Sequence, residues 1–103
     1  MTQNPRPVLD AVAENGSVYR IDFTNRTWTK HSRHGWTDPA ATLGELKVGT
    51  ELVEPWVKPE AWEDADKPVV GKHLYLSALN VWWVAKVIVK VVETTSDSEF
   101  TTL

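Results

Sequence analysis

The chain contains three histidines and no cysteine, so a zinc site would have to be built from imidazole and carboxylate groups. His31 and His34 stand three residues apart, and Asp38 follows as a candidate third ligand. Two imidazoles at this spacing are a weak motif, because a zinc site needs a defined third ligand. The segment is therefore interpreted as a polar, basic loop, and no metal or other cofactor is expected.

Motifs for catalysis are absent from the sequence. It has no Gly-rich phosphate loop, no nucleophile elbow and no paired carboxylates in a definable context. The lack of cysteine also excludes a disulfide scaffold and a cysteine-based zinc site. No catalytic residue is assigned, and the chain is not expected to be an enzyme.

Basic and aromatic residues interleave between positions 26 and 36. Arg26, Lys30 and Arg33 are the basic residues, and Trp36 closes the segment. Single-stranded nucleic acid is often bound in this way, with cations on phosphates and aromatic rings under bases. A hairpin with three solvated charges is the more ordinary interpretation. Nucleic-acid binding is therefore kept as the alternative function.

Tryptophan is the compositional exception, with six in a chain of 103 residues. If residues 81–92 form a strand, Trp83 lies on its apolar face and Trp82 points to the opposite face. Trp28 is likewise expected in the core. The remaining tryptophans lie in predicted loops or short helices, where an exposed indole is a frequent hot spot of protein interfaces.

An acidic stretch surrounds two of these tryptophans. Residues 44–66 contain seven acidic and two basic side chains, a net charge of −5, within a chain whose net charge is −3. An acidic surface studded with aromatic rings suits a basic protein partner, because complementary charges steer association. The predicted partner-binding residues are Trp36, Trp56, Trp62, Trp82, Glu54 and Glu60.

Alternating apolar and polar residues indicate the elements that carry these side chains. Residues 17–23 and 27–31 are expected to form a β-hairpin with Asn25 at positive φ in its turn. Shorter strands are expected around residues 51–53 and over residues 69–76. Residues 81–92 could be a helix or a strand, and their many β-branched residues favour a strand. Twelve residues exceed the usual strand length, so this strand is expected to bend or to change sheets.

The expected fold is α+β and mainly antiparallel β, a small partly open barrel or curved sheet with one or two short helices. The helices are predicted near residues 8–14 and 59–65. Residues 1–7 are expected to be a flexible arm, residues 8–93 a single compact domain and residues 94–103 an acidic mobile tail. No apolar run reaches the roughly 20 residues of a membrane span. A second copy of the chain could pair along an edge strand.

The sequence of residues 18–28 and 70–76 resembles that of small accessory proteins of actinobacterial phages, which share a YRID…N.TW opening and a later VG..L.L segment. The resemblance covers about half of the chain and departs from the pattern between Gly35 and Lys67. It implies a mycobacteriophage-like protein that binds and inhibits or redirects a host protein, and it transfers no catalytic residues. With no apolar leader at the N-terminus, the protein is expected in the cytoplasm of the host cell.

Overall fold

The computed structural model describes residues 7–54 and 56–103, and these residues form strands and no helix. Pro7 is therefore the one described residue of the arm predicted over residues 1–7. Within this part of the chain, no helix is long and apolar enough to cross a membrane. The strands are β1 (Val8–Ala13), β2 (Val18–Asp22), β3 (Thr27–His31), β4 (Ala41–Thr42), β5 (Leu46–Gly49), β6 (Glu63–Asp64), β7 (His73–Ser77), β8 (Trp82–Val84) and β9 (Ile88–Thr94).

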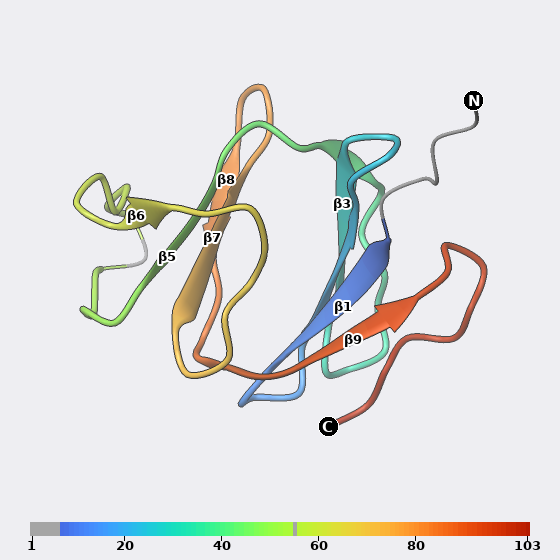
Figure 1. The fold of residues 1–103 in the computed structure, drawn as a ribbon. Coiled ribbons are helices and arrows are strands. Elements are labelled where there is room, and N and C mark those ends of the chain that lie inside the picture. Colours follow the sequence, from blue (N-terminus) through green and yellow to red (C-terminus); the bar gives the residue numbers. More distant parts are fainter. Residues whose placement is uncertain (1–6, 55) are drawn as a thin grey trace.

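Two antiparallel sheets face each other (Figure 1). One has five strands in the order β4-β3-β2-β1-β9, and the other has four in the order β6-β5-β7-β8. The predicted mainly antiparallel β architecture is confirmed. The strands do not close into a barrel, because the two sheets are separate ladders that pack face to face.

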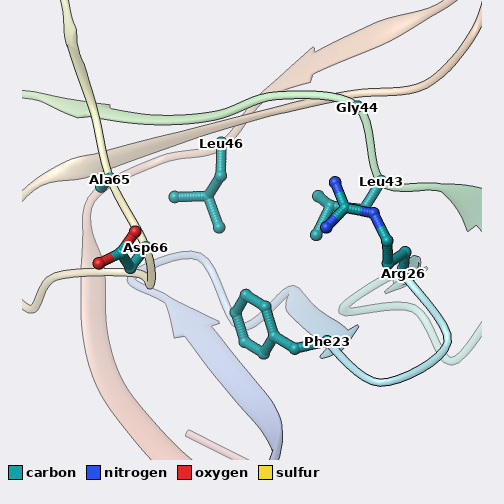
Figure 2. Close-up of a pocket in the computed structure, with 7 residues that line it drawn as sticks. All are labelled: Phe23, Arg26, Leu43, Gly44, Leu46, Ala65 and Asp66. Carbon is teal, nitrogen blue, oxygen red and sulfur yellow. The ribbon is translucent and has the colours of Figure 1, made fainter. Parts of the chain in front are cut away.

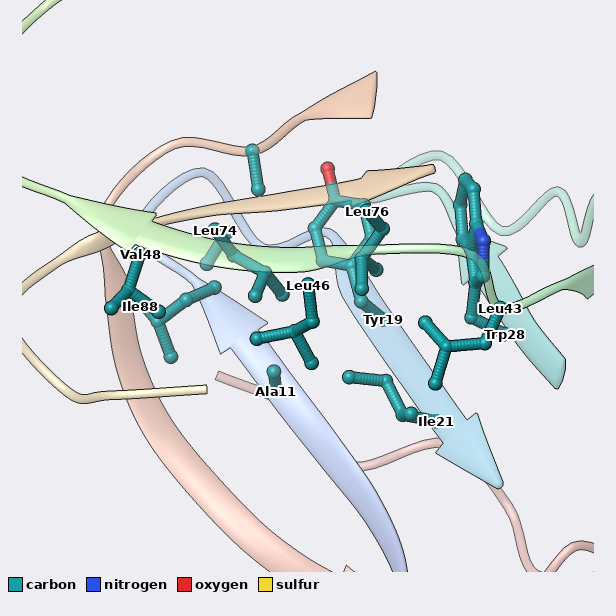
Figure 3. Close-up of a cluster of buried hydrophobic side chains, with 12 residues drawn as sticks. Ala11, Tyr19, Ile21, Trp28, Leu43, Leu46, Val48, Leu74, Leu76 and Ile88 are labelled. Atoms are coloured by element: carbon teal, nitrogen blue, oxygen red, sulfur yellow. The ribbon is translucent and has the colours of Figure 1, made fainter. Parts of the chain in front are cut away.

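The core lies between the two sheets (Figure 3). Alternate residues of β1, β2 and β3 point inward and meet alternate residues of β5 and β7, as the period of two in a strand requires. Trp28 is buried as predicted, and its indole Nε1 donates to the Ser77 carbonyl at 3.0 Å, which joins the two sheets. The core side chains include Ala11, Tyr19, Ile21, Leu46, Val48, Leu74, Leu76 and Ile88.

The predicted hairpin is confirmed as β2 and β3, which pair in register with Tyr19 opposite Lys30 and Ile21 opposite Trp28. Its turn differs in one detail. Arg26, not Asn25, takes the positive φ, at 54°. Asn25 instead donates from its side-chain amide to the Asp22 carboxylate at 2.8 Å, an interaction that favours a turn.

The predicted helices are both wrong. Residues 8–13 form β1, an inner strand between β2 and β9, because its inner residues are core members while Asp10 on the other face pairs with Arg20. Leu and Ala suit a helix, but burial on both faces of a sheet overrides this weak local preference. Residues 59–65 form turns followed by β6, because the Trp62 side chain packs down onto β5.

The Val-rich run behaves as a strand that changes sheets, as predicted. β8 pairs with β7 in the four-stranded sheet, and β9 pairs with β1 in the other. The crossing lies at Ala85 to Val87. The Ala85 amide bonds the Leu74 carbonyl, and the Val87 carbonyl accepts from Glu14. The link thus ties both sheets together at one corner.

A buried ion pair occupies the outer face of the five-stranded sheet. Arg20 bonds both carboxylate oxygens of Asp10, at 2.7 and 2.9 Å, and donates to the backbone carbonyls of Ser98 and Glu99. Thr101 donates to Asp10 through its amide and its hydroxyl. Burial alone would raise the pKa of Asp10, but the hydrogen bonds from Arg20 and Thr101 outweigh it and lower that pKa.

Residues 96–101 thus lie across β1 and β2. The Phe100 ring contributes as well, stacking on His31 with centroids 4.3 Å apart and lying 4.2 Å from the Arg20 guanidinium. Through these contacts, part of residues 94–103, the segment predicted as an acidic mobile tail, lies against the five-stranded sheet. Its mobility itself stays a prediction.

Candidate protein-binding surface

The connection between β5 and β6 presents large apolar side chains to solvent, and we call its described residues, 50–54 and 56–62, the Trp56 loop. The side chain of Trp56 is 75% exposed, and Leu52 and Val57 are exposed as well. The loop projects from the four-stranded sheet, away from the other sheet (Figure 1). Large apolar side chains exposed together are typical of an interaction site.

The base of the Trp56 loop is anchored by Trp62. Its indole packs against Gly49 so closely that a Cβ at that glycine would lie 2.3 Å from Trp62 Cγ. The same indole stacks on His73, with ring centroids 5.7 Å apart. Lys58 adds a hydrogen bond from Nζ to the Glu45 carboxylate at 3.1 Å. The loop therefore has a held base and an exposed apex.

The loop and its surroundings are acidic. Lys47 and Lys58 neutralise part of the charge, because Lys47 Nζ bonds Asp64 at 2.9 Å and Lys58 Nζ bonds Glu45. The hydrogen bond to Asp64 raises the pKa of Lys47, and the bond to Glu45 raises that of Lys58. Other acids of the stretch form no ion pair with any described residue, among them Glu51, Glu54 and Glu63.

A hollow of about 230 Å³ lies beside the loop. Leu52, Val53 and Trp62 of the Trp56 loop line one part of it, and His73 with residues 83–86 lines the rest. Most of this wall is apolar. The hollow therefore continues the exposed apolar surface of the loop onto β8.

Trp83 borders this hollow at the edge of the sandwich. Its side chain points inward as the strand parity predicted, yet it is 43% exposed because β8 is an edge strand. Its Nε1 donates to the Tyr19 hydroxyl at 2.8 Å, and Lys30 Nζ lies 3.6 Å from its ring centroid. Burial raises the pKa of Tyr19 to about 12, and the bond from Trp83 offsets that only in part.

The structure separates the predicted partner-binding tryptophans. Trp56 is exposed on the loop, whereas Trp62 is only 6% exposed and serves as its anchor. Trp82 is half-buried on the outer face of the four-stranded sheet, 6.0 Å from Tyr75 between ring centroids. Trp36 is exposed, but its loop follows β3 at the opposite side of the molecule (Figure 1). The remaining predicted residues, Glu54 and Glu60, are exposed on the Trp56 loop.

The predicted nucleic-acid-binding residues lie along β3 and at its two ends. Arg26 lies in the β2–β3 turn and Arg33 beyond the far end of β3, about 16 Å along a strand of five residues. Lys30, between them, is placed over Trp83. Arg26 borders a hollow of about 190 Å³ with Asp66 on its other side (Figure 2). Nucleic-acid binding by these three cations stays a prediction.

The histidines at 31 and 34 are likewise used in separate contacts. His31 Nδ1 lies 2.8 Å from the Thr37 hydroxyl, and His34 Nε2 accepts a hydrogen bond from Arg33 at 3.3 Å. No three His, Cys, Asp or Glu side chains gather for a metal ion within residues 7–54 and 56–103.

Sequence reasoning missed the exposed Leu52 and Val57 and the position of Trp83 at a sheet edge. The signal for the first two was present, since both flank Trp56 in a stretch broken by Pro55 and Pro59. The edge position depends on strand order, which no local pattern reveals.

When compared with protein-family models, curated proteins and solved structures, the chain matched none of them.

Proposed function

We propose that this protein is a protein-binding module whose contact surface is the Trp56 loop. The observation that carries the proposal is that a loop with a held base exposes Trp56, Leu52 and Val57 among acids that form no ion pair with described residues. Tryptophan is the side chain most enriched at interface hot spots. A loop whose base is held by packing and a hydrogen bond loses less conformational entropy on binding than one without such contacts.

The partner that fits this surface is a protein with a basic patch. Glu51, Glu54 and Glu63 leave the loop and its flank negatively charged, and complementary charge raises association rates and selects partners. The resemblance to actinobacteriophage accessory proteins extends the proposal to a host protein, which the module would inhibit or redirect inside the host cell.

The test uses two tryptophans of equal exposure. Trp56→Ala and Trp36→Ala each remove an indole that is about three-quarters exposed, at 75% and 72%. The full chain is used to capture proteins from an actinobacterial lysate. The captured protein is then purified and titrated against the wild type and both variants by calorimetry.

Trp56→Ala is expected to weaken binding by about 30-fold, since a hot spot contributes about 2 kcal/mol or more. Trp36→Ala is expected to leave the affinity unchanged, and rising salt should lower the association rate. Equal effects of the two substitutions would contradict the proposed surface. Salt-sensitive binding of single-stranded DNA that is lost in Arg33→Ala would favour the nucleic-acid alternative instead.

A further inference from the structure

The turn between β1 and β2, residues 14–17, carries the dipeptide Asn15–Gly16 at an exposed point of the fold. The Asn15 side chain is exposed, and Gly16 has a φ of +91°, which favours glycine because it has no Cβ. Asn25, which is exposed in the β2–β3 turn, is followed instead by Arg26. Asparagine before glycine is the sequence in which a backbone amide most easily attacks the side-chain amide, because no side chain hinders its approach.

The reaction open to this dipeptide is deamidation, with water as the co-reactant. Gly16 N loses its proton to base and attacks Asn15 Cγ, so a new C–N bond forms while the Cγ–Nδ2 bond breaks. Nδ2 takes up a proton and leaves as ammonia, and a cyclic imide remains. Water then opens the imide at either of its carbonyl carbons. The product is an aspartate or an isoaspartate at position 15, and both carry a new carboxylate.

The folded turn engages both reacting groups in hydrogen bonds. Gly16 N donates to the Ala13 carbonyl oxygen at 2.9 Å, and Asn15 Oδ1 accepts from the Ser17 amide at 3.1 Å. The first bond opposes the reaction, because the nitrogen must give it up when it loses its proton. The second restricts the orientation of the side-chain carbonyl that is attacked. The intact turn therefore protects Asn15, and the reaction requires that the turn opens.

Opening this turn does not require the sheet to unfold. Strand β1 is paired on both sides, with β2 and with β9, so its position does not depend on the turn. Glu14 and Asn15 are exposed, and no side chain of residues 14–17 belongs to the core between the sheets. The Glu14 amide adds one bond, to the Val87 carbonyl at 2.8 Å. Segments with few buried apolar contacts open with free energies below that of global unfolding.

We propose that Asn15 deamidates spontaneously in the folded protein, at a rate set by local opening of the turn at residues 14–17. The exposed side chain admits water and base, and the glycine presents no side chain to the attacking nitrogen. Opening frees Gly16 N while the pairing of β1 with β9 persists. The site lies outside the Trp56 loop, so the proposal does not depend on the proposed function.

The product would change the charge beside Arg33. A Cβ at Gly16 would lie 3.4 Å from Arg33 Cβ, so the turn lies against the loop that follows β3. Gly16 and Arg33 also line one hollow of about 350 Å³ together with residues 100–103. Arg33 forms no ion pair with a described residue, so a carboxylate at position 15 would add an opposite charge to its surroundings. An isoaspartate would also lengthen the turn by one backbone atom.

The test compares the full chain with a peptide of residues 12–19, both incubated at mildly alkaline pH. Peptide mapping by mass spectrometry follows the gain of one mass unit at each asparagine, with Asn25 as the internal control for an exposed turn. Hydrogen exchange at the Gly16 amide, followed by NMR on the same chain, measures how strongly the folded turn restrains that nitrogen. Asn15→Gln is the control variant, because glutamine would have to close a larger ring.

Asn15 is expected to convert while Asn25 stays intact, and Asn15→Gln should remove the conversion. Conversion in the folded chain should be roughly tenfold slower than in the peptide, the upper value for one net hydrogen bond, and slowed no less than hydrogen exchange at Gly16. Urea below the unfolding midpoint should speed it. Equal rates at Asn15 and Asn25 would overturn the site. A slowing smaller than that of hydrogen exchange, or conversion that begins only where urea unfolds the whole chain, would overturn the role of local opening.

Discussion

The buried pair of Asp10 and Arg20 gives a prediction in which pH changes the size of a mutational effect in a defined direction. Asp10 is 0% exposed and Arg20 is 7% exposed, so each charge depends on the other. Arg20→Met keeps most of the apolar volume of the side chain but leaves the Asp10 carboxylate buried without its cation. Removing one partner of a buried pair typically costs about 3–5 kcal/mol.

That loss is large beside the roughly 5–15 kcal/mol that stabilises most domains. With an m-value of about 2 kcal/mol per molar urea, the unfolding midpoint at pH 7 should fall by about 2 M. Urea titrations followed by tryptophan fluorescence measure it. Arg33→Met is the matched control, because Arg33 is exposed in a loop, and its effect should stay within about 0.5 kcal/mol.

The pH dependence separates the wild type from the variant. In the wild type the folded-state pKa of Asp10 is lowered, so the stabilisation is present above the unfolded pKa of about 3.9 and is lost as pH falls below it. Arg20→Met removes the hydrogen bonds and the charge by which Arg20 lowers the pKa of Asp10, so that pKa should be higher in the variant than in the wild type. Protonation then relieves the buried charge, so the variant should gain stability as pH falls from 7 to 4.

The penalty of Arg20→Met should therefore shrink at pH 4. The double variant Asp10→Asn with Arg20→Met has no buried charge, and at pH 7 it should be more stable than Arg20→Met alone. A penalty below about 1 kcal/mol, or one of equal size at both pH values, would refute the assigned role of the pair. If Arg20→Met does not fold at pH 7, the double variant and the titration from pH 4 upward still measure the coupling.

Three further predictions concern other parts of the fold. Gly49→Ala should destabilise the chain by about 1–3 kcal/mol in urea unfolding, because the new methyl group would overlap the Trp62 indole, and an unchanged unfolding midpoint would contradict this packing. Since the folded-state pKa of Tyr19 is raised to about 12, its contribution to stability is complete below about pH 10 and should be lost as pH rises toward 12, as fluorescence-detected unfolding in alkaline buffer would show. Phe100→Ala removes the ring that covers Arg20 and should speed hydrogen exchange at the Thr101 amide, and unchanged exchange would mean that the ring does not hold the segment.

Local sequence patterns predicted those parts of the fold that depend on one short segment of the chain. The β2–β3 hairpin follows from alternation over Tyr19, Ile21 and their neighbours, and the sheet change in residues 81–92 follows from a run too long for one strand. The strand β1 could not be predicted from a local pattern. Its identity depends on pairing with β9, some 80 residues later, and on an arginine in β2 that neutralises Asp10.

The candidate site was predicted in composition but not in arrangement. An acidic stretch with exposed aromatic side chains was expected, and Trp56 and Glu54 are exposed within it. The sequence could not show that Trp62 is buried, because its burial requires the bare backbone of Gly49 in β5 and the ring of His73 in β7. The separation of Trp36 from Trp56 similarly depends on which sheet each loop leaves.

Trp62 and Trp56 stand six residues apart in one loop and have opposite physical roles. The first is buried, and its ring contacts hold the base of the loop on the sheet. The second contributes little to folding because three-quarters of its surface remains in water. Fixing the base lowers the entropy that the loop loses when a partner covers its apex. The same anchoring indole is buried with its N–H unpaired, so holding the base of the loop on the sheet carries the cost of one unsatisfied donor.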